Sequence, residues 1–156
     1  MPGVPELLAA SAKKWYYEFV IGTTSVAALG AEALERLGRR TEACDLATAG
    51  LRDYRKALVR VELLRGLGRC AAEAAAVAAP RDVRPRTEEA RQALEEAVDV
   101  AQRNRFPLLE LLALGELQRL VLAPEGKEAE GMARLEASAR SMGGQPLSAF
   151  ASVRNW

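Results

Sequence analysis

The spacing of apolar residues most constrains the fold of this chain, because it repeats with a helical period. In the clearest stripe, small and branched apolar residues recur with mostly polar residues between them. Its apolar members are Ala90, Ala93, Leu94, Ala97, Val98 and Ala101. Such i, i+3, i+4, i+7 spacing places apolar side chains on one face of an α-helix. Apolar residues make up 49% of the 156 residues, and many of them are Ala and Leu, which favour helices. The sequence therefore predicts an all-α protein of about six to eight helices.

Glycines indicate helix boundaries in the first half of the chain, but one helix boundary stays undecided. An apolar stripe from Val26 ends at Gly38, a residue suited to a helix C-terminus, and Thr41 is expected to cap the next helix. Residues 41–65 carry an unbroken stripe, which fits one long helix or two helices separated near residues 52–53. The segment 66–68, Gly-Leu-Gly, is expected to force a turn, because glycine weakens helix interiors.

Proline marks the expected boundaries in the second half. Residues 80–86 contain two prolines and predict a loop, and Thr87 is expected to cap the helix that follows. Pro107 is expected to begin a leucine-rich helix at the centre of the C-terminal core. Leu112 and Leu117 are therefore predicted core residues.

Two of the expected turns have similar sequences. Residues 37–43 (LGRRTEA) and 67–74 (LGRCAAEA) both read Leu-Gly-Arg followed by Glu-Ala, and their glycines are thirty residues apart. A period in this range marks helical-hairpin repeats. Together with the A-x3-L-x2-A spacing of Ala90, Leu94 and Ala97, these segments resemble tetratricopeptide repeats. Alanines (Ala27 and Ala57) replace the aromatic residue of each first helix, so the expected array is degenerate.

The resemblance implies a short α-solenoid of stacked antiparallel helical hairpins over residues 26–142. Residues 1–25 are then an N-terminal helical extension, and residues 143–156 are a C-terminal tail. Tetratricopeptide-like proteins are generally interaction scaffolds. The resemblance therefore implies a non-enzymatic protein–protein interaction subunit of a larger assembly, with other protein subunits as its partners.

The absence of histidine narrows the possible chemistry. It excludes Ser-His-Asp and Cys-His catalysis, His-bearing zinc sites and haem held by a proximal His. The segment 66–68 lacks the third glycine of a dinucleotide fingerprint. We therefore expect no catalytic residue, cofactor, metal or small-molecule substrate. An enzyme that uses carboxylates or arginines on a helical fold is an alternative.

Cysteine usage and hydropathy predict the compartment. Cys44 and Cys70 form no C-x-x-C pair, and their small apolar neighbours suit buried, reduced thiols that react slowly. A regulatory thiol pair is the alternative. The longest uncharged N-terminal run, residues 19–31, falls short of the ~20 residues of a membrane span, and the first residues lack a secretory signal. We expect an intracellular protein, cytoplasmic or organellar, that is not secreted and has no transmembrane segment.

An aromatic cluster near the N-terminus is the main candidate partner site. Trp15, Tyr16 and Phe19 lie within about one helical turn and would form a ridge. The ridge could dock a partner, since exposed Trp and Tyr are common interface anchors, or it could pack against the protein's own core. The arginines expected to supply weaker rim contacts are Arg39, Arg40 and Arg55.

Charge is unevenly distributed along the chain. Residues 36–86 carry twelve Lys and Arg against six Asp and Glu (net +6), whereas residues 87–136 carry six against eleven (net −5). This asymmetry fits a bipolar surface that orients the protein in an assembly, or two solvated faces that happen to differ. The alternative function is an RNA-associated helical-repeat protein. One basic cluster and a net charge of +1 disfavour nucleic acid as the partner. That cluster consists of Arg52, Arg55, Lys56 and Arg60.

Overall fold

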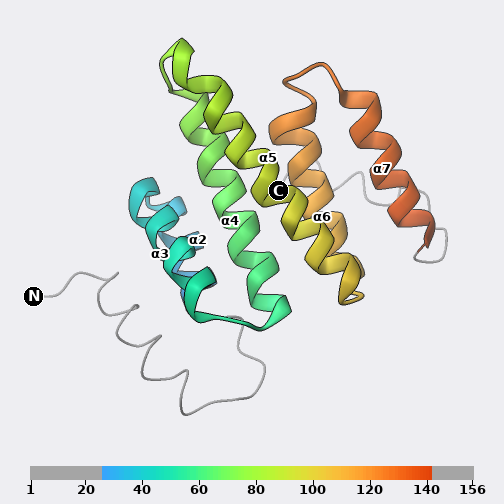
Figure 1. The fold of residues 1–156 in the computed structure, drawn as a ribbon, viewed down its shortest axis with the longest axis horizontal. Helices are drawn as coiled ribbons and strands as arrows, with labels where there is room; N and C mark the ends of the chain where they lie inside the picture. The colour runs from blue at the N-terminus through green and yellow to red at the C-terminus, as the bar shows by residue number, and fades with distance from the viewer. Residues whose placement is uncertain (1–25, 142–156) are drawn as a thin grey trace, which may run out of the picture.

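The computed structural model describes residues 26–141, and every regular element in that range is helical, which confirms the all-α prediction (Figure 1). The elements are α2 (Val26–Arg36), α3 (Arg40–Asp53), α4 (Ala57–Ala76), α5 (Pro80–Arg103), α6 (Pro107–Leu117), a π-helical turn η1 (Gln118–Leu122) and α7 (Glu128–Ser141). The predicted extension at residues 1–25 and the tail at 143–156 lie outside the described residues.

Consecutive helices run antiparallel and pack against one another. Figure 1 shows α4 and α5, the longest helices, at the centre, with α2 and α3 on one side and α6 and α7 on the other. In addition, α4 contacts both α2 and α6 directly. Short connections between the helices enforce this alternation, because a chain that turns within a few residues must return beside the helix it has left.

The main core joins α4, α5 and α6. Its buried members come from α4, α5 and α6: Val61, Leu64, Ala97, Val98, Val100, Ala101, Ala113 and Leu114. Three of its four α5 members, Ala97, Val98 and Ala101, belong to the stripe that the sequence placed on one helix face, whereas Val100 does not. A second cluster contains Leu117, which is fully buried as predicted. Leu112 is only partly buried, so its assignment to the core is wrong. Its neighbours Ala113 and Leu114 face the core instead.

The turn predicted at residues 66–68 is wrong, because α4 continues through it. Gly66 and Gly68 are both buried. A Cβ at Gly68 would lie 2.7 Å from Cδ2 of Leu94 and closer still to its Cγ. Glycine at this position therefore does not break the helix. It lets the backbone of α4 approach the buried Leu94 of α5 more closely than any side chain would allow.

The loop predicted at residues 80–86 is also wrong, because α5 begins at Pro80. Proline suits the first turn of a helix, where its missing N–H would have no intrahelical partner. Pro85 lies inside α5, near its exposed end, where it removes one backbone hydrogen bond without ending the helix. Thr87 is therefore not a cap: its hydroxyl donates to the carbonyl of Val83 at 2.9 Å.

Residues 41–65, which the sequence fits to one long helix or to two, belong to two separate helices in the structure. α3 ends at Asp53, and Tyr54 adopts an extended conformation (φ −101°, ψ 121°) that turns the chain away. The Tyr54 side chain is buried, at 8% exposure, in the cluster that joins α2, α3 and α4. Packing of this aromatic ring fixes the break, which no glycine or proline marks in the sequence.

Candidate functional site

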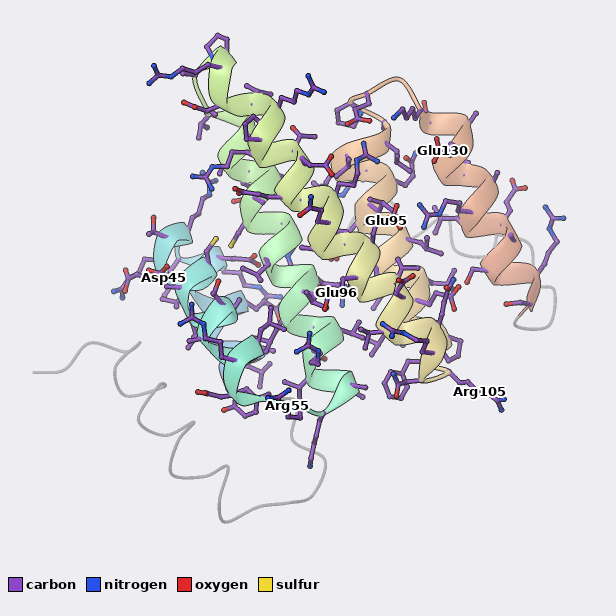
Figure 2. All side chains as sticks on the ribbon, in the orientation of Figure 1. Asp45, Arg55, Glu95, Glu96, Arg105 and Glu130 are labelled. Atoms are coloured by element: carbon purple, nitrogen blue, oxygen red, sulfur yellow. The ribbon has the colours of Figure 1, made fainter. Side chains whose placement is uncertain are left out.

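Two turns of equal length lie at the same edge of the molecule. Residues 54–56 connect α3 to α4, and residues 104–106 connect α5 to α6. In both turns an arginine lies two residues before the next helix, and a leucine is the second residue of that helix. Figure 2 shows the two arginines, Arg55 and Arg105, along the same lower edge. The leucines are Leu58 and Leu108.

Both leucines are exposed although they begin apolar helices. Leu58 is 40% exposed and Leu108 is 65% exposed. Arg55 and Arg105 are also exposed, and none of the ion pairs between described residues involves either guanidinium. Each turn therefore presents an arginine without an ion pair among the described residues and, three residues away, an exposed leucine; in the first turn Lys56 is a second exposed cation.

Further cations flank the two turns. Arg52 and Lys56 are exposed beside Arg55, and Arg103 donates its Nε to the backbone carbonyl of Asp99 at 3.2 Å. Residues 52–58 and 102–110 together carry five Lys and Arg against two carboxylates, Asp53 and Glu110. We call this surface the basic–leucine edge. Its members are Arg52, Arg55, Lys56, Leu58, Arg103, Arg105 and Leu108.

The two turns are held by one core. Leu51, Ala57, Phe106 and Leu109 are partly buried and pack against the cluster that joins α4, α5 and α6. These residues flank the two turns on their inner side, so the exposed cations and leucines rest on a common packed base. The edge is thus a fixed surface rather than two independent loops.

The backbone at Arg105 adds a second distinguishing feature. Within residues 26–141, three helix ends carry a residue with positive φ followed by an amide that bonds back five residues: Gly38 (φ 73°), Arg105 (φ 56°) and Gly126 (φ 76°). This is the geometry of a Schellman cap, which normally uses glycine because a Cβ is disfavoured there. At the basic–leucine edge an arginine occupies the position, at a cost of about 1 kcal/mol.

The structure does not bring the predicted arginines together. Arg39 makes two 2.6 Å hydrogen bonds to Glu42, and Arg40 pairs with Glu73 at 2.6 Å. Both lie at the start of α3, whereas Arg55 follows its end, about 20 Å away at 1.5 Å of rise per residue. The first two arginines are engaged in ion pairs, and only Arg55 is free.

The structure places Arg60 of the predicted basic cluster, but it does not describe the predicted aromatic ridge. Arg60, the fourth member of the predicted basic cluster, pairs with Glu96 at 2.8 Å and donates to the carbonyl of Leu51. It therefore braces α4 against α5. The aromatic ridge lies outside the described residues, so its role stays a prediction; its members are Trp15, Tyr16 and Phe19.

Sequence reasoning missed Leu58, Arg105 and Leu108. One signal was present: Arg-x-x-Leu occurs at both 55–58 and 105–108. The motif is too short to stand out alone. It gains meaning only from its equivalent position in the two turns, which depends on helix boundaries that the sequence left open.

A second candidate is a half-buried ion network that connects α2, α4 and α6. Arg69 of α4 donates to Glu35 of α2 at 3.0 and 3.1 Å, and to Glu116 of α6 at 2.9 Å. Arg65 makes two further bonds to Glu116, at 2.7 and 2.9 Å. Burial raises the pKa of Glu35, and the Arg69 guanidinium partly opposes this. The charges face one another across helices, so the network clamps three helices together.

One of the two cysteines is less buried than the sequence predicts. Cys70 is buried, as predicted, but Cys44 is only partly buried, so the prediction of two buried thiols is wrong for Cys44. The two lie in contact between α3 and α4.

Across residues 26–141, no group of three or more Cys, Asp or Glu side chains is placed to hold a metal ion. None of the helices in this range is both long and apolar enough to cross a bilayer. No family model, curated protein or solved structure matches the chain.

Proposed function

We propose that this protein is a non-enzymatic interaction subunit of a larger assembly, and that its basic–leucine edge binds an acidic, amphipathic segment of a partner protein. The observation that carries the proposal is the repeated turn: at two equivalent positions a free arginine stands beside an exposed leucine. Leucines can bury apolar area in such a complex, while the surrounding cations select and orient an acidic partner.

The arrangement of helices supports a scaffold of the tetratricopeptide-like kind. If α2–α3, α4–α5 and α6–α7 are taken as hairpins, the first helix of each contacts the first helix of the next. The second helix of each hairpin packs against the next hairpin as well, α3 on α4 and α5 on α6. This is how stacked hairpins bury a continuous core. Successive first helices begin at residues 26, 57 and 107, so we propose an irregular, degenerate array.

The RNA alternative has less support at this edge. Proteins that hold single-stranded RNA combine cations with exposed aromatic side chains on which bases stack. The aromatic residues of these two turns point inward: Tyr54 is buried and Phe106 packs against the core. Leucine offers apolar area but no stacking surface. The edge therefore fits a protein segment better than it fits a nucleic acid.

The test compares edge variants with matched controls in affinity purification of the native assembly. The edge variants are Arg55→Glu/Arg105→Glu and Leu58→Ser/Leu108→Ser. Leu37→Ser is a matched apolar control, because Leu37 is 64% exposed but lies outside the edge. Arg84→Glu is the charge control, because Arg84 is exposed in α5, far from both turns.

We expect both edge variants to lose a partner that both controls retain, and we expect crosslinks from that partner to reach residues 52–58 or 102–110 through an acidic segment. Equal recovery of all partners by edge and control variants would contradict the proposal. Loss of binding after nuclease treatment, with no protein partner changed, would favour the RNA alternative. Circular dichroism should first establish that each variant remains helical.

A further inference from the structure

Two cysteines from neighbouring helices lie together in one packed cluster. Cys44 of α3 packs against the buried cluster of Leu34, Ala43 and Cys70, which brings the two cysteines together. The residues are far apart in the sequence, so the fold rather than local chain geometry brings them together. Because the contact spans α3 and α4, a bond here would join the α2–α3 pair to the central helices.

The two thiols have different surroundings. Cys70 is 3% exposed, and its Sγ lies 3.7 Å from Oε1 of Glu35 and 3.9 Å from the carbonyl oxygen of Arg40. Cys44 is only partly buried, so a small oxidant can reach it. The adjacent Cys70 thiol lowers the pKa of Cys44. The interaction with Cys44, together with burial and nearby Glu35, raises the pKa of Cys70.

This asymmetry assigns separate roles to the two residues. A thiolate is the reactive form of cysteine, and it forms more readily at Cys44, which is also the more accessible sulfur. Cys70 keeps its proton and is protected, yet it is in contact with the first sulfur. A partly exposed thiolate beside a sheltered second thiol is the arrangement that converts an oxidised cysteine into a disulfide.

We propose that Cys44 and Cys70 form an intramolecular disulfide when the protein meets a hydroperoxide. The Cys44 thiolate attacks the terminal peroxide oxygen, the O–O bond breaks, and the leaving alkoxide or hydroxide takes up a proton. Cys44 becomes a sulfenic acid by a two-electron oxidation. Cys70 then attacks the Cys44 sulfur, an S–S bond forms, and the sulfenic oxygen leaves with the Cys70 proton as water. Thiol reductants reverse the modification.

The bond would restrain the first turn of the basic–leucine edge. It closes a loop that contains residues 54–56, and it fixes the first half of α3 to the second half of α4. The hydroperoxide reaction does not depend on the proposed binding function, and its test needs no partner.

The experiment treats the intact protein with a stoichiometric amount of hydrogen peroxide and digests it without reduction. Trypsin should release residues 41–52 joined to residues 70–81, with two hydrogens fewer than the separate peptides. The linked species should disappear after treatment with dithiothreitol. Absence of this species in peroxide-treated folded protein, or disulfides only between two molecules, would overturn the proposal.

Two single variants test the assigned order. Cys70→Ser should accumulate a Cys44 sulfenic acid that a cyclic 1,3-dione traps, because the second thiol is missing. Cys44→Ser should consume peroxide at least about tenfold more slowly, because its remaining thiol is buried and protonated. Equal rates for the two variants would refute the assignment of Cys44 as the reacting thiol. Both substitutions are small, and circular dichroism provides the control for folding.

Discussion

The glycines of α4 permit a paired test of how this helix meets α5. Gly66 and Gly68 are both buried and lie in the same turn of the helix. A Cβ at Gly66 would have only one neighbour within contact range, Nη2 of Arg69 at 3.8 Å. A Cβ at Gly68 would collide with three carbons of the Leu94 side chain, including Cγ, which cannot swing away without moving the whole side chain.

The two alanine substitutions should therefore have opposite signs. Alanine is about 1 kcal/mol better than glycine inside a helix, so Gly66→Ala should stabilise the protein by about 0.5–1 kcal/mol. Gly68→Ala gains the same stability from helix propensity, but overpacking a full core costs about 1–3 kcal/mol or more. The collision is severe, so we expect a net loss of about 2 kcal/mol.

Urea denaturation followed by circular dichroism measures both free energies of unfolding. The double variant Gly68→Ala/Leu94→Ala supplies the internal control, because Leu94→Ala alone should cost about 2–5 kcal/mol. Truncating Leu94 removes the collision, so the double variant should be more stable than the sum of the single losses predicts. Stabilisation by Gly68→Ala, or destabilisation by Gly66→Ala as a turn at 66–68 would require, would refute the reasoning.

Three further predictions follow from individual residues. Arg105→Gly should raise the free energy of unfolding by about 0.5–1 kcal/mol by relieving positive φ, whereas Arg105→Ala should not, and thermal denaturation compares the two. Leu117→Ala should cost about 2–5 kcal/mol, and Leu112→Ala clearly less, because only Leu117 is fully buried. The hydrogen bonds from Arg134 lower the pKa of Glu95 in the folded protein. The contribution of this ion pair to the free energy of unfolding is therefore present above the unfolded pKa of about 4.3, and it is lost as pH falls through the lower pKa of the folded state. The stability difference between wild type and Glu95→Gln should shrink in that acidic range, and a pH series of urea midpoints that shows a constant difference would count against the ion pair.

The helical class and several core positions could be predicted because they depend on periodicity alone. Ala90, Leu94 and Ala97 repeat at helical spacing, and all three are fully buried. Such a stripe needs no knowledge of what lies opposite, because any covering surface would make the same residues the inner face.

The helix boundaries were harder to predict, because glycine and proline act through their surroundings. Gly68 resembles a helix breaker until Leu94 of α5 is seen against it. Pro80 and Pro85 resemble a loop, but one begins a helix and the other removes a hydrogen bond near an exposed end. In contrast, the true break at Tyr54 depends on burial of an aromatic ring. The outcomes at Gly68 and Tyr54 are decided by tertiary contacts, and those at the two prolines by where each one falls in its helix.

The candidate site was also hard to predict, because it depends on how the helices are placed relative to one another. The arginines at 39, 40 and 55 look alike in the sequence, and only their partners distinguish them: Glu42 and Glu73 neutralise the first two. Glu73 is distant in the sequence from Arg40, so this ion pair cannot be seen before the helices are placed. Leu58 and Leu108 likewise look like core residues of apolar helices until the turns before them are located.

Departures from local rules occur together at the basic–leucine edge, the surface that we propose binds a partner. Elsewhere in residues 26–141, positive φ is found at Gly38 and Gly126, and many arginines, such as Arg69, are matched with carboxylates. At the edge, an arginine occupies a glycine position and exposed leucines begin two helices. A strained cap, unmatched charge and solvated apolar area each make the isolated protein less stable or less soluble. Their occurrence together at Arg105 and Leu108, and in part at Arg55 and Leu58, is explained if a partner covers them.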